Sequence, residues 1–121
     1  MSKRSLVSVV DDDESVRESL PDLLQELGFN AKTFASGEEF LKSEHVAATR
    51  CLILDVAMPG MSGPELQLEL ISRGHKFQII FITAKADEKI RRRLISQGAV
   101  ECLFKPFSEQ QLQSALDAAM K

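Results

Sequence analysis

Short apolar runs alternate along the chain with longer stretches in which apolar residues recur every three or four positions. The short runs are rich in apolar and β-branched residues, which is typical of strands; they cover residues 6–10, 29–34, 51–54, 79–82 and 100–104. Each run is followed by helical spacing. In the first helical stretch, residues 14–27, Val16, Leu20 and Leu24 share a face, and Gly28 follows as a C-terminal cap. The pattern predicts five strand–helix pairs.

Helix starts are marked in two places by capping boxes. Ser36 with Glu39 and Ser108 with Gln111 have the serine-to-acid-or-amide spacing that closes the first turn of a helix. They predict a short helix through residues 40–41 and a last helix through residues 112–119. Two more helices are expected, at residues 66–73 and at residues 90–95, the latter ended by Gly98.

The runs at residues 6–10, 51–54 and 79–82 are almost continuously apolar, so we expect them to be buried on both faces. Strands of that kind belong to parallel sheets that are covered by helices on both sides. The predicted fold is therefore α/β, a doubly wound (βα)5 arrangement with a five-stranded parallel sheet. In such sheets, sites lie at the carboxyl ends of the strands.

Composition narrows the class of protein. With 121 residues, the chain fits a single domain over residues 1–121, and 44% hydrophobic residues suffice for a core. The net charge of −3 argues against nucleic-acid binding, and no apolar run is long enough to span a membrane. We expect a cytoplasmic protein. One basic cluster is predicted to be a solvated helix face; it comprises Lys85, Lys89, Arg91, Arg92 and Arg93.

The cysteines and histidines indicate neither a disulfide framework nor zinc. Cys51 and Cys102 lie in separate apolar runs, with no CxxC or Cys/His cluster. We expect both to be buried free thiols. His45 and His75 lie in polar connecting segments and are expected to be exposed.

Reactive side chains stand where four of the strands end. Asp11, Asp12 and Asp13 follow the first run, and the later runs end at Asp55, Thr83 and Lys105. Two carboxylates about 4 Å apart repel by about 4 kcal/mol at an effective dielectric of 20. A cation among them is therefore required, and hard carboxylate oxygens in a half-open site suit Mg²⁺. Asp13 is expected to act instead as the cap of the following helix.

A metal, a lysine and a hydroxyl around one carboxylate are the groups that stabilise a transferring phosphoryl group. The carboxylate itself can be the nucleophile and form an acyl phosphate. The ordered set of strand-end residues therefore favours phosphoryl chemistry at Asp55.

These residues resemble the receiver domains of two-component response regulators, most closely the FixJ-like receivers, over essentially the whole chain. The matching segments are residues 10–17 (VDDDESVR), 55–63 (DVAMPGMSG), 81–84 (FITA) and 104–107 (FKPF). The resemblance implies the CheY-like, flavodoxin-like fold with strand order 2-1-3-4-5, and a phosphorylation-dependent switch rather than an enzyme with a separate substrate.

The resemblance also implies residue roles. Asp55 would accept a phosphoryl group from a histidine kinase. Asp12, Asp55 and the backbone carbonyl of Ala57 would ligate Mg²⁺, and Asp11 would act through a metal-bound water. Thr83 and Lys105 would bind the phosphoryl oxygens, and Lys105–Pro106 would be a cis peptide.

One position departs from the family. Cys102 stands three residues before Lys105, where receivers usually carry Tyr or Phe. We expect the signal still to pass through Thr83 and the loop that follows it. It would reach the face made by the last two helices and the strand between them, where a partner or a second copy would bind. In a homodimer, the basic cluster would pair with acidic residues such as Asp117.

Other interpretations of the sequence are an enzyme, a flavin binder and a receiver that acts without an attached output domain. An aspartate-nucleophile phosphatase of the haloacid-dehalogenase kind needs a second aspartate at the position of Ala57, and an FMN binder would not place three aspartates after its first strand. A stand-alone receiver or a phosphorelay intermediate is the alternative to the expected arrangement. That arrangement is the N-terminal part of a longer transcriptional regulator whose DNA-binding output domain lies outside these residues.

Overall fold

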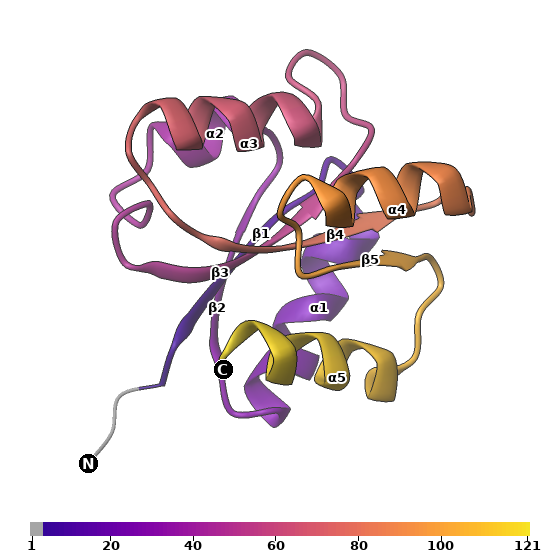
Figure 1. The fold of residues 1–121 in the computed structure, drawn as a ribbon. Helices are drawn as coiled ribbons and strands as arrows, with labels where there is room; N and C mark the ends of the chain where they lie inside the picture. Colours follow the sequence, from indigo (N-terminus) through magenta and orange to yellow (C-terminus); the bar gives the residue numbers. More distant parts are fainter. Residues whose placement is uncertain (1–3) are drawn as a thin grey trace.

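The structure, a computed structural model, describes residues 4–121, and strands alternate with helices throughout (Figure 1). The strands are β1 (Leu6–Val10), β2 (Asn30–Phe34), β3 (Thr49–Asp55), β4 (Gln78–Thr83) and β5 (Glu101–Phe104). The helices are α1 (Glu14–Glu26), α2 (Gly37–Leu41), α3 (Gly63–Ser72), α4 (Glu88–Ser96) and α5 (Glu109–Ala119). The five predicted strand–helix pairs are confirmed.

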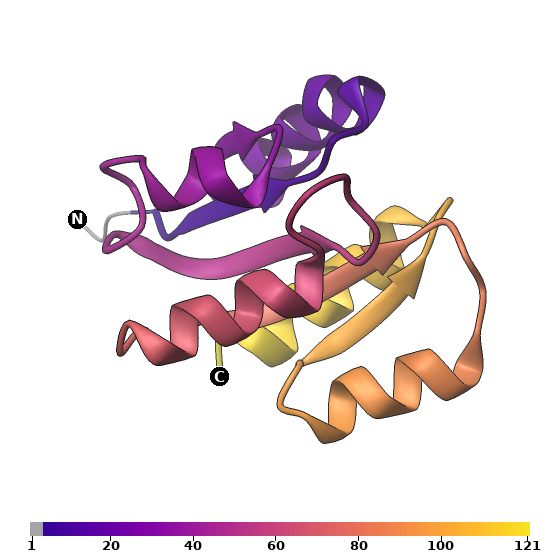
Figure 2. The ribbon, with the colours of Figure 1, turned by 90° about the horizontal axis from the view of Figure 1, so that it is seen from above.

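All neighbouring strands pair in parallel in the order β2-β1-β3-β4-β5. The register places Val10 opposite Leu54, and Asp55 opposite Ile82. Because the strands are parallel and in near-equal register, their carboxyl ends all meet at one edge, as the view from above shows (Figure 2). The predicted fold class and strand order are confirmed.

Helices cover both faces of the sheet, with α2, α3 and α4 on one side and α1 and α5 on the other (Figure 1). Phe40, Leu66 and Leu94 belong to the core on the first side. Leu24 and Leu116 belong to the core on the second side. The almost continuous apolar character of β1, β3 and β4 follows from this, since alternate residues of one strand are needed in both cores.

Helices α2, α3 and α5 begin after capping serines, whereas α1 and α4 begin after Asp13 and Asp87. One of the predicted capping boxes differs. Ser108 and Gln111 form the predicted capping box of α5, and Ser62 with Glu65 forms another at α3. At α2, Ser36 accepts from the backbone N–H of Glu39, but the Glu39 carboxylate accepts from the backbone N–H of Ala35 instead of that of Ser36. The box at α2 is therefore only half formed.

The two cysteines are buried and free, as predicted. Cys102 packs in the core under α2–α4, whereas Cys51 packs in the core under α1 and α5. The sheet itself thus separates their sulfur atoms. Burial raises the pKa of the Cys51 thiol to about 12.

The histidines were wrongly predicted to be exposed. Both are half-buried, and the ring of His75 stacks on Phe77 with centroids 5.4 Å apart. The prediction failed because it considered only the polar character of the surrounding segment. An imidazole ring is flat, and its faces can pack on a neighbouring aromatic ring even in a polar segment.

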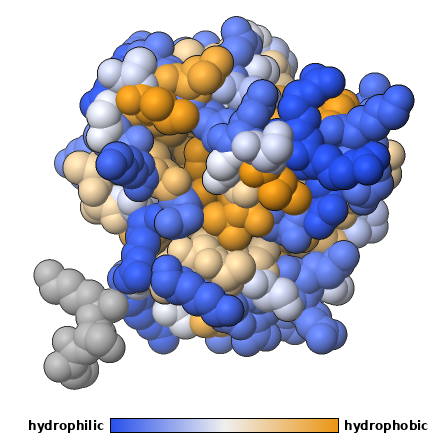
Figure 3. Space-filling view, in the orientation of Figure 1, coloured by the Kyte–Doolittle hydropathy of each residue, from blue (hydrophilic) through white to orange (hydrophobic). Residues whose placement is uncertain are grey.

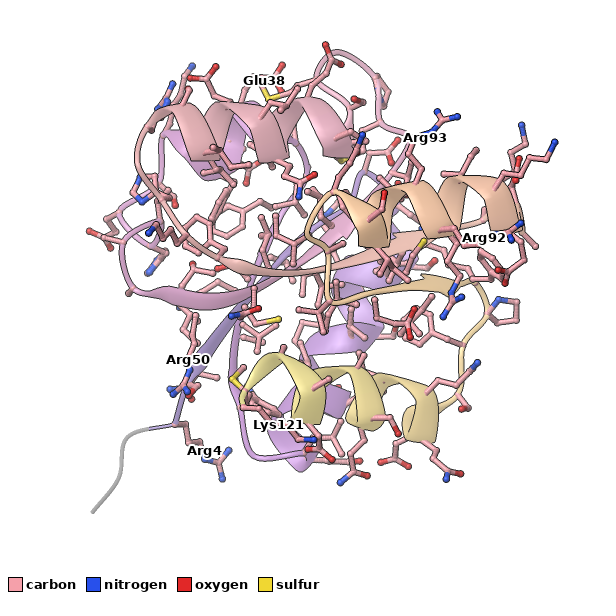
Figure 4. All side chains as sticks on the ribbon, viewed as in Figure 1. Arg4, Glu38, Arg50, Arg92, Arg93 and Lys121 are labelled. Atoms are coloured by element: carbon pink, nitrogen blue, oxygen red, sulfur yellow. The ribbon has the colours of Figure 1, made fainter. Side chains whose placement is uncertain are left out.

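The basic cluster is a solvated face except at Arg91. Lys85, Lys89, Arg92 and Arg93 are exposed, and Figure 4 shows Arg92 and Arg93 extending from α4. Arg91 turns toward β5 instead, where its Nη2 lies 2.7 Å from Glu101 Oε1 and its Nε donates to the carbonyl of Cys102.

The surface over α3 carries apolar side chains, whereas the surface over α4 is strongly hydrophilic (Figure 3). Leu68 and Ile71 account for the exposed large apolar side chains among residues 4–121. None of the helices in that part of the chain combines the length and hydrophobicity that a membrane crossing requires.

Candidate functional site

The site forms where four strands end side by side. Asp55 is the last residue of β3 and Thr83 the last of β4, whereas Asp11 and Lys105 directly follow β1 and β5. Main-chain hydrogen bonds lock the strand ends together, from Val56 N–H to Ile82 C=O at 3.0 Å and from Lys105 N–H to Thr83 C=O at 2.8 Å. The predicted convergence of these residues is confirmed.

Three carboxylates gather at the centre of this edge. Asp11, Asp12 and Asp55 each offer an oxygen, and these atoms lie within 4.8 Å of one another. Asp11 is fully buried and Asp55 is 6% exposed, whereas Asp12 reaches solvent. Asp13 is separate: its side chain accepts from the backbone N–H of Ser15 and caps α1, as predicted.

Lys105 supplies the fixed positive charge. Its Nζ lies 2.8 Å from Asp11 Oδ2 and 3.9 Å from Asp55 Oδ1. The lysine therefore pairs first with the buried Asp11 and more distantly with Asp55. The peptide bond between Lys105 and Pro106 is cis, as the resemblance implied.

The remaining two site residues are Thr83, at the end of β4, and Ala57, in the loop that follows β3. Thr83 is buried, and its hydroxyl oxygen accepts from the backbone N–H of Lys85 at 3.1 Å, which leaves the hydroxyl proton free to be donated. Ala57 lies exposed in the loop that leaves β3, two residues after Asp55. Its carbonyl oxygen remains a predicted ligand.

The electrostatics of the cluster call for a further cation. Burial, and then the neighbouring Asp11 carboxylate, raise the pKa of Asp55 to about 7 against the opposing effect of Lys105. One lysine faces three carboxylates, so the charged form of Asp55 is disfavoured. The donors are all hard oxygens, and Asp12 and Ala57 keep the site open to water. This set fits Mg²⁺, which prefers few carboxylates and retains several waters.

Sequence reasoning assigned no role to two residues at this edge. Arg17, in α1, donates from Nη1 to the backbone carbonyl of Asp11 at 3.0 Å. Gly63, the first residue of α3, packs so closely against the backbone of Asp55 that a Cβ there would collide with the Asp55 carbonyl oxygen. Both residues lie within the segments that carry the resemblance, but only contacts in three dimensions reveal what they touch.

The chain is similar to known signalling proteins. The family described as the response regulator receiver domain matches residues 7–117. The response regulator protein TodT of Pseudomonas putida is 40% identical over the whole chain and 54% of its own length. The transcriptional regulatory protein FixJ of Azorhizobium caulinodans is 36% identical over 94% of the chain and 54% of its own length. The chain spans about half the length of these relatives.

Solved structures of response regulators have a similar fold. The response regulator StyR superposes with a TM-score of 0.86 at 44% identity, covering 97% of this chain and 59% of that one. The FixJ-N crystal structure gives a TM-score of 0.83 at 34% identity, covering 98% of this chain and 94% of that one.

Five parallel strands in the order 2-1-3-4-5 with an acidic cluster at their carboxyl edge define a CheY-like receiver. The chain belongs to the response regulator receiver domain family and is a phosphorylation signalling switch. The acidic pocket of such domains generally binds Mg²⁺, and Asp11, Asp12 and Asp55 form that pocket here.

Proposed function

We propose that Asp55 is the phosphoryl acceptor of this domain and that a histidine kinase is the donor. The observation that carries the proposal is the position of Asp55 at the end of the central strand β3, within the acidic cluster and 3.9 Å from Lys105, whose closer partner is the fully buried Asp11 at 2.8 Å. A bound Mg²⁺ would favour the charged form of Asp55, and attack of that carboxylate on phosphorus would need no proton removal.

In the transfer, an Asp55 carboxylate oxygen forms a bond to the phosphorus of a phosphohistidine as the P–N bond breaks. The electron pair of that bond goes to the imidazole nitrogen. Because the other ring nitrogen of the phosphohistidine carries a proton, the products are an acyl phosphate and neutral histidine. Lys105, 3.9 Å from Asp55 Oδ1, and the hydroxyl of Thr83 are proposed to bind the phosphoryl oxygens as their charge redistributes. Water later attacks the phosphorus and restores the carboxylate, so the domain turns over only its own phosphate and is not an enzyme with a separate substrate.

Asp12, Asp55 and the carbonyl of Ala57 are proposed to hold Mg²⁺, with Asp11 acting through a metal-bound water. When bound, the ion neutralises negative charge on the carboxylates and the phosphoryl oxygens. Asp11 is then the residue that links this charge to Lys105, since its second oxygen pairs with the lysine.

Residues 1–121 are proposed to be the N-terminal receiver of a longer transcriptional regulator, since relatives such as TodT and FixJ are about twice as long. Phosphorylation would change the face made by α4, β5 and α5, and the missing output domain or a second copy would bind there. The domain itself would contact neither nucleic acid nor membrane.

The test is incubation with acetyl phosphate and Mg²⁺ followed by intact-mass measurement. The protein should gain one phosphoryl group, and Asp55→Asn should abolish the gain. Asp13→Asn is the matched control, because asparagine caps a helix as well as aspartate does and the phosphoryl gain should persist. Survival of the gain in Asp55→Asn would exclude Asp55 as the acceptor, whereas loss of the gain in Asp13→Asn would mean that the effect of Asp55→Asn is not specific to that residue.

A further inference from the structure

We infer that Arg17 is a positioning residue that sets the direction in which Asp12 enters the metal site. The inference rests on the proposed Mg²⁺ function of the acidic cluster. It concerns the first turn after β1, where the chain leaves the sheet and delivers two of the three carboxylates.

The chain leaves the sheet at Asp11. The backbone N–H of Asp11 still donates to the carbonyl of Phe34, at the end of β2, at 3.1 Å. The carbonyl of Asp11 instead accepts from a side chain, the Nη1 of Arg17, at 3.0 Å. Asp11 is fully buried, and a buried carbonyl that lost its donor would carry a desolvation penalty. At the residue where the strand ends, Arg17 therefore supplies the hydrogen bond to the carbonyl that a neighbouring strand would otherwise supply.

That carbonyl belongs to the peptide bond that joins Asp11 to Asp12. The peptide unit is planar, so fixing its oxygen fixes the plane and the direction of the Asp12 Cα. Asp12 is exposed, and its carboxylate oxygen lies within 4.8 Å of those of Asp11 and Asp55. Arg17 is thus the side chain that fixes the peptide leading to the Asp12 carboxylate.

Asp11 itself is held independently of Arg17. Its Oδ1 accepts from the backbone N–H of Asp13 at 2.9 Å, and its Oδ2 pairs with Lys105 at 2.8 Å. Loss of the Arg17 bond should consequently leave Asp11 in place and release chiefly the peptide that leads to Asp12. The expected defect is a less organised metal site on an intact core.

The positive charge of Arg17 and its hydrogen bond to the backbone predict opposite effects of its removal on Mg²⁺ affinity. A guanidinium bound next to three carboxylates repels a divalent cation, so its removal would tighten Mg²⁺ binding if its charge were its main effect. If its main effect is positioning, its removal weakens Mg²⁺ binding, as loss of contacts behind metal ligands generally does. The sign of the change separates the two.

The experiment measures Mg²⁺ affinity of the unphosphorylated protein by calorimetric titration, with no phosphodonor present. Arg17→Met should bind Mg²⁺ at least about threefold more weakly than the wild type. Arg93→Met removes the same charge from an exposed position on α4, and Ser19→Ala removes a hydrogen bond within α1 to the carbonyl of Ser15. Both controls should bind as the wild type does. Unchanged or tighter binding by Arg17→Met would overturn the inference.

Circular dichroism at the titration temperature checks that each variant is folded. If Arg17→Met does not fold, Arg17→Gln replaces it with the same expected sign, because the shorter amide does not reach the Asp11 carbonyl. In acetyl phosphate reactions, the variant should be slow at low Mg²⁺ and recover at saturating Mg²⁺. A rate that stayed low at saturation would contradict a positioning role.

Failure of this inference differs from failure of the proposed function. If the wild type bound no Mg²⁺, or gained no phosphoryl group on Asp55, the proposed function would fail. If the wild type did both and Arg17→Met bound Mg²⁺ equally well, only the role of Arg17 would be wrong.

Discussion

Among single residues at the site, Lys105 is expected to stabilise the fold. It is the partner of a fully buried carboxylate, Asp11. We expect Lys105→Met to lower the free energy of unfolding by about 2–3 kcal/mol, below the value for fully buried pairs because the lysine side chain is partly exposed. Urea unfolding measures the change, and Lys85→Met, at an exposed position, should have little effect.

Mg²⁺ supplies a second check on the same pair. Because the ion brings positive charge to the three carboxylates, saturating Mg²⁺ should restore part of the stability that Lys105→Met loses. An equal loss with and without Mg²⁺, or no loss at all, would mean that Lys105 does not neutralise the cluster.

Asp55 predicts a pH dependence of stability in the metal-free protein. Its pKa is raised from 3.8 to about 7 in the folded state by burial and by Asp11. The folded protein therefore retains this proton to a higher pH than the unfolded chain does. The free energy of unfolding should be highest below pH 4 as far as this group is concerned, and should fall as pH rises from about 4 to about 7.

Thermal unfolding at a series of pH values, in the presence of a chelator, measures this trend. Asp55→Asn should flatten the decline and raise the melting temperature at pH 8, whereas Asp117→Asn, on the exposed side of α5, should leave the decline unchanged. Mg²⁺ should stabilise the wild type more at pH 8 than at pH 5. A decline that survived in Asp55→Asn would have to come from another group.

At the scale of elements, α3 is tied to the active edge by its first residue. Gly63 follows the capping Ser62 and lies against the backbone of Asp55, so a Cβ has no room. Gly63→Ala should destabilise the protein by at least about 2 kcal/mol, because backbone does not move aside as a side chain does. Chemical denaturation measures the loss.

Gly37 offers a matched control. It too follows a capping serine at the start of a helix, but its Cβ would meet the flexible end of Met61, at 3.2 Å from Sδ. Gly37→Ala should change stability by no more than about 1 kcal/mol, since alanine favours the helix and the methionine can shift. Equal losses in the two variants would argue against a specific contact at Gly63.

The difference between these glycines also shows where sequence reasoning stops. Each element was predictable because its period and its caps are local: Ser108 and Gln111 formed their box as expected. The half-formed box at Ser36 was not predictable from the sequence, because the Glu39 carboxylate could accept from either of two neighbouring backbone N–H groups. In the structure it accepts from that of Ala35. Likewise nothing local distinguishes Arg91, which turns to Glu101, from its exposed neighbours Arg92 and Arg93.

For the whole molecule, the order and direction of the strands explain why the residues of the site could be predicted from the sequence. Parallel strands bring Asp11, Asp55, Thr83 and Lys105 to one edge whatever the details of packing, so the membership of the site could be predicted. The pairing within it could not, because the preference of Lys105 for Asp11 over Asp55 is set by side-chain distances of 2.8 and 3.9 Å. Cys51 and Cys102 belong to the cores on opposite faces of the sheet, and this placement keeps their side chains apart.

The phosphorylated site is expected to affect the rest of the molecule through Thr83 and not through Cys102. A groove of about 620 Å³ runs between α4, β5 and α5, and its walls include Cys102, Arg91 and Ala115. Cys102 is buried and small, so it can neither fill this groove nor move far. Thr83 has a direct path to the same face, because its carbonyl accepts from the backbone N–H of Lys105 and its hydroxyl from that of Lys85. We therefore expect the change to travel through the Thr83 hydroxyl and the loop after β4.

Beryllofluoride with Mg²⁺ mimics an aspartyl phosphate and allows this to be followed by amide chemical shifts. Amides of α4, β5 and α5 should shift along with those around Asp55. Thr83→Ala should confine the shifts to the Asp55 pocket, because without the hydroxyl the β4–α4 loop has no group to draw toward the phosphoryl oxygens. Cys102→Ala should keep the distant shifts, since that side chain is not expected to move. If the wild-type shifts stayed near Asp55, or if Cys102→Ala rather than Thr83→Ala abolished the distant ones, the signal would not pass through Thr83.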